Sequence, residues 1–405
     1  KLNVQDLDVA GRRVLVRVDF NVPLDADGKI TDDSRVRASL PTIDWLLERG
    51  ARVILCSHLG RPKGKPDPSM SLRPVAKHLS DLLNRPVAFL DDCVGEKVEK
   101  TVGIMKDGDC LLLENVRFYA AEEKNDSAFA KQLASCAELY VNDAFGSAHR
   151  AHASTEGVAR FVQKSAAGFL LQKELQYLGD ELANPARPFV AILGGAKVSD
   201  KIAVIESLLD KADTLLIGGA MAYTFLRAQG IPTGASLVEE DRLDMSRRVL
   251  ELASKKNKRI FLPVDHVVAR RVETDKLDKK GRKIVEFQGA HATDCASIGE
   301  GLCGVDIGPK TLEVYSRAVG TAKTVLWNGP MGIFENKQFS RGTFEVAKAV
   351  AASGAKSIIG GGDSVKAIHQ SGLSDKITFL STGGGASLEF LEGKVLPGVA
   401  ALNEK

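Results

Sequence analysis

The strongest constraint on the fold of this chain is the alternation, along its whole length, of short apolar segments with helical patterns. The apolar segments are rich in β-branched residues, and glycine or polar residues follow each of them before an amphipathic pattern of about 10 to 15 residues. This alternation is typical of parallel α/β sheets, in which helices cover the sheet between successive strands. The clearest predicted strands are 13–20, 52–57, 109–115, 138–143, 188–193, 214–219, 259–265, 323–329, 356–362 and 377–385.

The predicted strands divide into two groups near residue 180. A chain of 405 residues is long for a single core, and two domains of about 200 residues are expected. Residues 168–188 predict an amphipathic helix that ends at Asn184-Pro185, and we interpret it as a connector; the alternative is a crossover helix within one large sheet. We therefore expect an α/β fold with two doubly wound, Rossmann-like parallel-sheet domains joined by a helical hinge. Segments 64–70 and 275–283 are expected to be exposed loops.

Charge and cysteine usage argue against several classes of protein. The formal net charge is +3, and the sequence has no run of five like charges, so nothing indicates nucleic-acid or membrane binding. Six cysteines without a CxxC pair favour reduced thiols in an intracellular compartment. No segment approaches the roughly 20 apolar residues of a membrane span, and residues 1–20 lack a signal-peptide pattern. We expect a cytoplasmic protein, and because the sequence starts at Lys1, a plastid or glycosomal form stays open.

In the first half of the chain, basic and polar side chains follow the predicted strands. Ligands of open parallel sheets bind beyond the carboxyl ends of the strands. One surface Arg or His is more often solvated or structural, but several at one sheet edge favour a small, multiply anionic ligand, because Arg offers paired donors to phosphate and carboxylate. The candidates are Asp19, Asn21, Arg35, His58, Arg61, Arg117 and Arg150, while His149 and His152 stay open between ligand contact and scaffold.

In the second half, glycines follow the predicted strands, at 194–195, 218–219, 329, 360–362 and 383–385. Glycine lets backbone N–H groups approach a phosphate, and the N-terminus of a following helix adds positive potential. The segment "GGAKVSDK" at 194–201 lacks the spacing of a P-loop. It nevertheless brings Lys197 and Lys201 to a strand end, and if a helix begins near Val198 both lysines can lean toward that end.

Two acidic residues interrupt this glycine-rich lining. Asp363 in "GGGDS" is predicted to open a helix beside the phosphates, which suits a Mg²⁺ ligand, because Mg²⁺ usually takes one or two carboxylates plus substrate phosphates. The alternative for Asp363 is a helix N-cap. Glu335 could accept hydrogen bonds from ribose hydroxyls. A small anion in one half and a Mg²⁺-nucleotide in the other predict phosphoryl transfer between ligands on facing domains.

From about residue 4 to 400 the chain resembles the phosphoglycerate kinase family. The resemblance rests on "RVDFNVP" (17–23), "SHLGRP" (57–62), "LLLENVRF" (111–118), "DAFGSAHRAHAS" (143–154), "LGGAKVSDK" (193–201), "IGGAMAYTFL" (217–226), "WNGPMGIFE" (327–335), "IIGGGDS" (358–364) and "STGGGASLEFLEGKVLPG" (381–398). It implies Mg²⁺-dependent, reversible phosphoryl transfer between 1,3-bisphosphoglycerate and ADP, giving 3-phosphoglycerate and ATP, in glycolysis, gluconeogenesis or carbon fixation. It also implies a monomer with domains 1–177 and 178–389, with 390–405 packing back onto the first domain and an active site in the interdomain cleft.

The resemblance further implies the residues of two binding sites. The triose-phosphate site is expected at Asp19, Phe20, Asn21, Arg35, His58, Leu59, Gly60, Arg61, Arg117 and Arg150. The nucleotide site is expected at Gly194, Ala196, Lys197, Lys201, Gly219, Gly304, Val305, Asn328, Pro330, Glu335, Gly361, Gly362, Asp363 and Ser364, with Asp363 on Mg²⁺. The family more often has Thr where Ser364 stands, and the hydroxyl is retained.

The predicted reaction needs no general base, because its acceptors, a carboxylate and the β-phosphate of ADP, are ionised near neutral pH. We assign charge neutralisation to Arg35 and Lys201, supported by Lys197 and by backbone N–H groups at Gly361 and Gly384, and we expect hinge closure to exclude water. Two alternative functions fit the sequence less well. A dinucleotide-dependent dehydrogenase requires a GxGxxG turn, which the glycine segments do not fit. A non-catalytic phosphate-binding module accounts for the arginines but not for Asp363 or the glycines.

Overall fold

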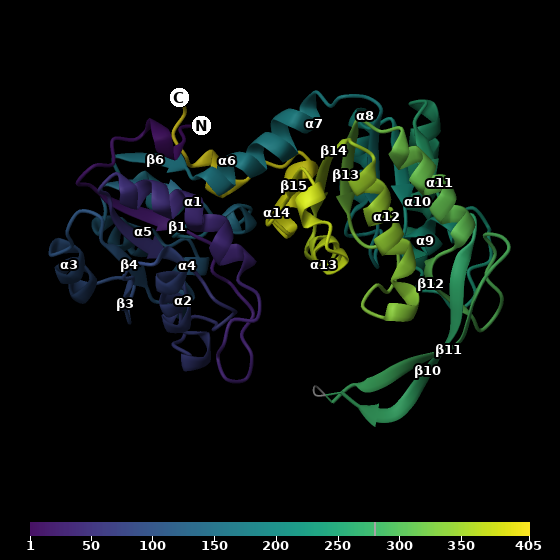
Figure 1. Cartoon of the computed structure of the whole chain (residues 1–405), viewed down its shortest axis with the longest axis horizontal. Coiled ribbons are helices and arrows are strands. Elements are labelled where there is room, and N and C mark those ends of the chain that lie inside the picture. Colours follow the sequence, from purple (N-terminus) through teal and green to yellow (C-terminus); the bar gives the residue numbers. More distant parts are fainter. Residues whose placement is uncertain (279–280) are drawn as a thin grey trace. The chain divides into compact units, whose positions relative to one another are not determined.

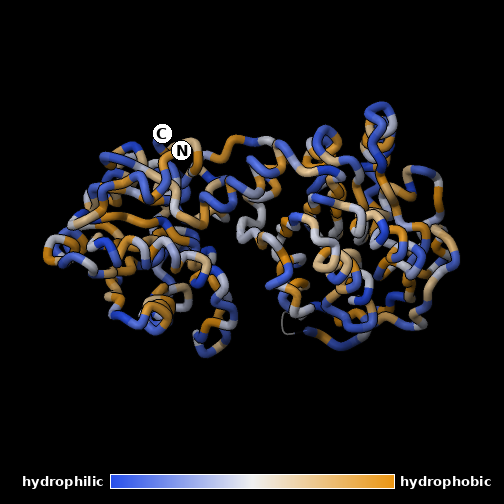
Figure 2. The backbone as a smooth tube through the Cα atoms, turned by 45° about the horizontal axis from the view of Figure 1, so that its top comes forward, coloured by the Kyte–Doolittle hydropathy of each residue, from blue (hydrophilic) through white to orange (hydrophobic). Residues whose placement is uncertain are grey.

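The computed structural model describes residues 1–278 and 281–405 and divides the chain into two compact units (Figure 1). Unit 1 consists of Lys1–Gln176 and Lys394–Lys405, and unit 2 of Tyr177–Gly393. The sequence predicted domains 1–177 with 390–405 and 178–389; the assignment of a ligand to each stays a prediction. Within each unit, Figure 2 shows apolar segments running through the interior and hydrophilic segments at the margins.

Unit 1 is built on a six-stranded sheet in the order β3-β4-β2-β1-β5-β6, and all its strand pairs are parallel. The order reverses at β1, and such a reversal is where ligands of open α/β sheets bind. The strands are β1 Arg13–Arg17, β2 Arg52–Cys56, β3 Ala88–Leu90, β4 Cys110–Leu113, β5 Leu139–Asn142 and β6 Lys164–Ala167. The helices are α1 Ser34–Glu48, α2 Arg73–Leu83, α3 Glu96–Gly103, α4 Ala120–Glu123, α5 Ser127–Ser135 and α6 Phe169–Leu175.

The C-terminal segment completes unit 1 rather than unit 2. The helix α15, Pro397–Ala400, follows the last loop of the chain, and the Gly398 N–H donates to the Ala148 carbonyl at 2.8 Å. The Ser165 N–H, at the start of β6, donates to Asn403 Oδ1 at 2.7 Å. Backbone and side-chain hydrogen bonds therefore hold the last residues against an edge of the first sheet.

Unit 2 repeats the architecture with the order β15-β14-β13-β7-β8-β9, again with parallel pairs throughout. The strands are β7 Phe189–Leu193, β8 Thr214–Ile217, β9 Arg259–Phe261, β13 Thr324–Asn328, β14 Lys356–Gly360 and β15 Phe379–Leu380. The helices are α8 Ile202–Lys211, α9 Met221–Ala228, α10 Leu243–Lys255, α11 Pro309–Gly320, α12 Arg341–Ala352, α13 Gly362–Ser371 and α14 Gly385–Leu391. The expected pair of parallel α/β sheets is confirmed.

The antiparallel sheet β11-β10-β12 of unit 2 was not predicted. Its strands are β10 His266–Leu277, β11 Lys283–Ala292 and β12 Cys303–Ile307. The prediction of a loop over 275–283 was wrong where β10 extends to Leu277 and β11 starts at Lys283; the part of it at 279–280 lies outside the described residues. The hairpin was missed because its outer half is exposed and therefore lacks the apolar pattern of a buried strand.

The segment predicted as a connector helix is helical from Phe169 to Ala183, but it is not one regular α-helix. A π-helical turn, Gln176–Asp180, separates α6 from α7, Glu181–Ala183. Its buried face includes Leu171, Leu178 and Leu182. Short π-helical insertions occur frequently at functional positions of helices, and here the turn begins where unit 1 gives way to unit 2. Among the helices in the described part of the chain, none is long and apolar enough to cross a membrane.

Candidate functional site

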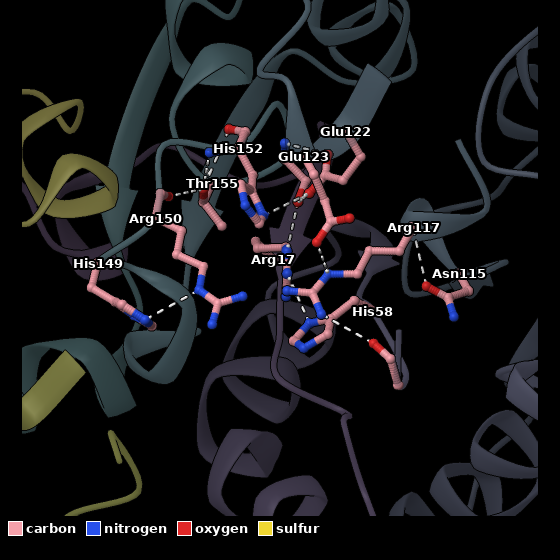
Figure 3. A network of polar contacts seen from close by, with 12 residues as sticks. Arg17, His58, Asn115, Arg117, Glu122, Glu123, His149, Arg150, His152 and Thr155 are labelled. Carbon is pink, nitrogen blue, oxygen red and sulfur yellow. Dashed lines mark hydrogen bonds and ion pairs between the residues drawn. The ribbon is translucent and has the colours of Figure 1, made fainter. Parts of the chain in front are cut away.

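Arg17 is the centre of a buried polar network at the carboxyl edge of the unit 1 sheet (Figure 3). It ends β1 and is fully buried. Its Nε donates to Ser154 Oγ at 2.8 Å, and its Nη2 lies 3.1 Å from His58 Nδ1. Because a guanidinium can only donate, Nδ1 of His58 accepts and the ring proton is on Nε2.

His58 is neutral in this arrangement. Burial lowers the pKa of His58 well below its ordinary value, and the charges of Arg17 and Arg117 lower it further. A neutral ring that accepts through Nδ1 has one remaining polar atom, the Nε2–H. Near neutral pH, His58 can therefore offer a hydrogen bond to an anionic ligand without contributing a positive charge.

Glu122 supplies the negative charge of the network. It is fully buried on α4, where its carboxylate accepts from Ser154 Oγ at 2.5 Å and from the Ser154 N–H at 2.9 Å. Burial raises the pKa of Glu122, against the effect of Arg17 and of these hydrogen bonds. His152 Nδ1 lies 4.0 Å from Glu122, and burial, with Arg117 and Arg17, lowers the pKa of His152 to about 4. His152 is thus a neutral part of the same network.

Two further arginines border the network in Figure 3. Arg117 lies in the short helical turn Val116–Phe118, and its Nη1 donates to the Gly60 carbonyl at 3.0 Å. Burial lowers the pKa of Arg117 below its usual value. Arg150 Nε donates to His149 Nε2 at 3.2 Å. The structure thus brings together His58, Arg117 and Arg150, as the sequence predicted, around an Arg17 that the sequence analysis did not select.

Arg35, on helix α1, binds the loop that follows β1, and Asn21 of that loop binds the loop that follows β2. Its Nη1 lies 3.1 Å from both carboxylate oxygens of Asp19 and donates to the Asn21 carbonyl at 3.2 Å. Asn21 Oδ1 accepts from the Gly60 N–H at 2.9 Å. The Arg35 side chain keeps 36% of its surface exposed, so it can turn toward a ligand.

The remaining predicted residues of unit 1 are placed differently. The side chains of Phe20 and Leu59 belong to the apolar core, which leaves their backbone groups for any ligand contact. Arg61 is exposed, and within the described ranges its side chain forms no hydrogen bond or ion pair. Nothing in the structure therefore connects Arg61 to the buried network.

Unit 2 has a cavity of about 650 Å³ at the carboxyl ends of its parallel strands. Its wall includes aromatic and aliphatic side chains that the sequence analysis did not select, among them Tyr223, Phe287 and Met331. Seven predicted nucleotide-site residues line it, namely Ala196, Gly219, Gly304, Val305, Pro330, Glu335 and Asp363. The other predicted residues, Gly194, Lys197, Lys201, Asn328, Gly361, Gly362 and Ser364, are not part of its wall.

The glycines at these strand ends serve two different purposes. A Cβ atom on Gly194 would lie 2.1 Å from the Pro330 carbonyl oxygen, and one on Gly219 would lie 2.4 Å from the Gly195 nitrogen. At these positions glycine lets the loops after β7, β8 and β13 pack against each other. A Cβ atom on Gly362 or Gly384 would meet nothing within 4 Å, so backbone there is open to a ligand.

Lys201 is buried under the loop after β7, with 8% of its surface exposed. Its Nζ donates to the carbonyls of Gly194 at 2.5 Å and Asn328 at 2.8 Å. Burial lowers the pKa of Lys201 to about 8. The ammonium is thus held at the strand ends by backbone oxygens and is cationic near pH 7.

The condition of a helix beginning near Val198 is not met, because α8 begins at Ile202, after Lys201. The Glu239 carboxylate accepts the N–H groups of Val198 at 2.6 Å and Ser199 at 3.0 Å, and this holds the segment as a turn. Lys197 is exposed, so the two lysines do not share a helix face.

Helix α13 directs its N-terminus and Asp363 toward the cavity. Its N-cap is Gly361, with φ 87° and no side-chain capping bond. Asp363, in the first turn, is therefore not the N-cap that the sequence left open as an alternative.

Ser364 Oγ accepts the Gly329 N–H at 2.6 Å, so its hydroxyl holds the loop that follows β13. Asn328 Nδ2 is buried without a hydrogen-bond partner among the described residues, which leaves a donor beside Gly361.

The acidic groups at the cavity suit a metal that arrives with its ligand. In the described ranges no three His, Cys, Asp or Glu side chains gather closely enough to hold a metal ion by themselves. Asp363 lines the cavity and is exposed. One carboxylate fits Mg²⁺ bound mainly by nucleotide phosphates and water, so the residues present are compatible with the predicted role of Asp363.

Comparison with known proteins gives a match over nearly the whole chain. A family model described as phosphoglycerate kinase matches residues 4–394. A phosphoglycerate kinase of Clostridium botulinum (strain Hall) is 56% identical over 407 residues, covering 100% of this chain and 99% of the relative. One of Anaeromyxobacter dehalogenans is 58% identical over 403 residues, covering 99% of each.

Two solved structures agree with these matches. The phosphoglycerate kinase from Coxiella burnetii has a TM-score of 0.87 at 42% identity and covers 99% of this chain and 98% of its own. The phosphoglycerate kinase from Pyrococcus horikoshii OT3 has a TM-score of 0.82 at 34% identity, with the same coverage of 99% and 98%.

Proposed function

Because this chain belongs to the phosphoglycerate kinase family, we propose that it transfers a phosphoryl group reversibly between 1,3-bisphosphoglycerate and ADP, giving 3-phosphoglycerate and ATP. The chain is a kinase, and its substrates are small molecules that include a nucleotide. One observation carries the detailed proposal. A cationic network lies at the carboxyl ends of the strands of one parallel sheet. A cavity with aromatic side chains and glycines in its wall lies at the carboxyl ends of the strands of the other.

The network of unit 1 is proposed to hold the triose phosphate. Arg35, Arg117 and Arg150 neutralise its carboxylate and phosphate, since a guanidinium pairs with both groups through two donors. His58 adds a neutral N–H donor. The other contributors are proposed to be Asp19, Asn21 and Arg61, together with backbone groups of Phe20, Leu59 and Gly60.

The cavity of unit 2 is proposed to hold the nucleotide. Apolar and aromatic walls suit a base, and Glu335 on the wall suits ribose hydroxyls as an acceptor. Lys197, Lys201, Asn328 and the N-terminus of α13 supply positive potential and donors for phosphates. Asp363 would hold Mg²⁺, which supplies charge neutralisation on the phosphate oxygens when it is bound.

The chemical step is proposed to be a direct in-line transfer. Both acceptor oxygens are ionised near pH 7, so positioning and charge neutralisation are the tasks left to the protein. Arg35 from unit 1 and Lys201 from unit 2 are assigned to the phosphoryl oxygens, with backbone N–H groups at Gly361 and Gly384 in support. Because the two substrates are assigned to different units, the proposal includes a closure that brings them together and excludes water.

An assay of 3-phosphoglycerate-dependent ATP consumption tests this function. We expect ADP to form only when ATP, Mg²⁺ and 3-phosphoglycerate are all present, and consumption to stop when Mg²⁺ is chelated. Turnover that persists without 3-phosphoglycerate contradicts the proposal. Binding of both ligands without turnover supports a binding module instead, and saturable NAD binding supports a dehydrogenase.

We further propose that the protein is a cytoplasmic monomer. Sedimentation equilibrium tests the oligomeric state.

A further inference from the structure

A second cavity of unit 2 lies at the sheet edge opposite the proposed nucleotide site. Its wall includes Val190 of β7, Thr214 at the start of β8 and Arg259 at the start of β9. Because these strands are parallel neighbours, their amino ends share one edge, whereas the nucleotide cavity is at their carboxyl ends. The volume is about 780 Å³, within the roughly 300 to 1,000 Å³ of small-molecule sites. A ligand here would not overlap the nucleotide.

The charged side chains of this second cavity are predominantly basic. Its wall has five cationic residues, namely Arg187, Lys256, Lys258, Arg259 and Arg317, and one acidic residue, Asp213. The cations come from three segments, namely the entry to β7, the stretch 256–259 that joins α10 to β9, and helix α11. The fold therefore brings Arg187 and Arg317 to a short basic stretch, 256–259, and gathers the positive charge around this hollow.

Three of the five cations are balanced by acidic partners. Arg187 Nη1 lies 2.6 Å from Asp213 Oδ1, and Asp213 Oδ2 also accepts the Phe189 N–H at 2.7 Å. Lys256 pairs with Asp210, and Arg317 pairs with Glu313 at 2.8 Å.

The other two cations are not balanced. Throughout residues 1–278 and 281–405, neither Lys258 nor Arg259 has a side-chain hydrogen bond or ion pair. They are adjacent in the chain, so two positive charges face the cavity without compensation. Two such charges at one site favour a doubly charged anion, and a guanidinium can bind an oxyanion through two parallel donors.

The floor of the cavity is apolar. It consists of Val190 and Phe261 from the sheet and Val314 and Ala318 from α11. An inorganic ion bound by Lys258 and Arg259 would leave this apolar floor in contact with water. A ligand with an apolar ring could bury both surfaces, and burial contributes about 25 cal/mol per Å² of apolar area.

We propose that this second cavity binds an amphipathic organic phosphate. The phosphate dianion pairs with Lys258 and Arg259, and an apolar ring lies on the floor formed by Phe261, Val314 and Ala318. This site is separate from the proposed site of phosphoryl transfer. A ligand bound here does not take part in that reaction.

The probe for a test is 1-naphthyl phosphate, which combines a ring with a phosphate dianion. It is titrated calorimetrically into the full chain with ADP, Mg²⁺ and 3-phosphoglycerate saturating, so that the proposed reaction sites are occupied. We expect one saturable site and binding weakened at least about tenfold in K258Q/R259Q, because two charge-assisted contacts are lost. Inorganic phosphate alone is expected to bind more weakly than the probe, because it does not use the floor.

The matched control is R248Q/K255Q, which removes the same charge from α10 outside the cavity wall and should change the affinity less than about twofold. A318F fills the floor and should abolish binding with every charge retained. Methyl NMR shifts of Val190 and Val314 should move with the probe. Equal weakening in the two double variants, no saturable binding, or shifts confined to the nucleotide cavity would each overturn the proposal. Retained ATP consumption shows that the variants are folded.

Discussion

The proposed role of Arg35 in neutralising the phosphoryl group can be separated from a structural role by substitution. In the structure its Nη1 binds Asp19 and the Asn21 carbonyl, so a ligand must compete with these contacts. An Arg that neutralises a moving phosphoryl group is worth about 10³ to 10⁵ in rate. We therefore predict that Arg35→Ala lowers kcat by about three orders of magnitude or more, measured as 3-phosphoglycerate-dependent ATP consumption.

Arg37 provides the control for this prediction. It lies two residues further along α1, is paired with Asp33 at 3.0 Å, and keeps 59% of its side chain exposed. Arg37→Ala removes the same charge from the same helix and should change kcat less than about twofold. A loss of only a few-fold in Arg35→Ala, with circular dichroism unchanged, would exclude the assigned role.

The lowered pKa of Lys201 gives the reaction a predicted pH dependence. Burial lowers this pKa to about 8, so the ammonium is present below pH 8 and is lost as the pH rises through that value. If the charge is required, kcat/KM for the nucleotide should fall above pH 8, since kcat/KM reports groups of the free enzyme.

Lys201→Arg separates Lys201 from other titrating groups. Arg stays protonated above pH 12, so the variant should be slower because its geometry differs but should lose the decline near pH 8. Lys197→Arg, at the exposed neighbour, should retain the decline. A decline near pH 8 that is unchanged in Lys201→Arg would assign the titration to another group.

At the residue scale, the sequence predicted the residues that follow the strands of unit 1 better than the two charged residues buried among them. His58, Arg117 and Arg150 were selected because they follow strands, and the structure gathers them in one region (Figure 3). Arg17 and Glu122 were missed. A signal for Arg17 was present, since a charge inside the apolar run "RVLVRVDF" is costly to bury unless it is paired. Nothing local marked Ser154 or Glu122 as its partners, because that pairing depends on the fold.

At the scale of single elements, helix α13 allows a test of the proposed phosphate site, because its N-terminus is the proposed phosphate contact. Gly361 has φ 87°, and a Cβ atom there would lie 3.2 Å from Asn328 Nδ2. Gly361→Ala should lower the free energy of unfolding by about 1 to 3 kcal/mol, because a backbone at φ 87° and ψ 132° is strained for a residue with a side chain. It should also raise the KM for ATP, because the shifted backbone no longer directs its N–H groups at the phosphates.

Gly354 is the matched control for the helix. It has φ 69° and nothing within 4 Å of an added Cβ atom, so Gly354→Ala also places a side chain on a backbone with positive φ, at a residue outside the cavity wall. Chemical denaturation should show a loss of stability in both variants, while only Gly361→Ala raises KM. If KM rises equally in both, the effect comes from general destabilisation and α13 has no special contact.

Elements were predictable where burial imposes a pattern. All ten strands selected from apolar runs lie in the two parallel sheets. The short edge strands β3 and β6 and the largely exposed hairpin of β10 and β11 were missed, since they are either brief or polar. The start of α8 could not be predicted from local patterns, because Glu239 fixes the turn that precedes it. Glu239 is 40 residues from Ser199 in the sequence, and no local rule includes such a contact.

At the scale of the whole molecule, each of the two proposed binding sites is built from the residues of one unit. The network around Arg17 consists of unit 1 residues alone, and the residues of the nucleotide cavity all belong to unit 2. Each has its own sheet and core. Under the proposed assignment, either substrate binds to one unit without the other, whereas transfer requires groups from both.

This division predicts that both substrates together, and neither alone, make the molecule more compact. A non-reacting pair, 3-phosphoglycerate with ADP and Mg²⁺, allows the bound state to be measured without turnover. Small-angle scattering should give a smaller radius of gyration with the pair than with either ligand, as expected when ligands on two bodies drive closure. Arg35→Ala serves as a comparison, because a variant that still binds both ligands but lacks the bridging charge should close less. An unchanged radius of gyration with both sites saturated would contradict the closure.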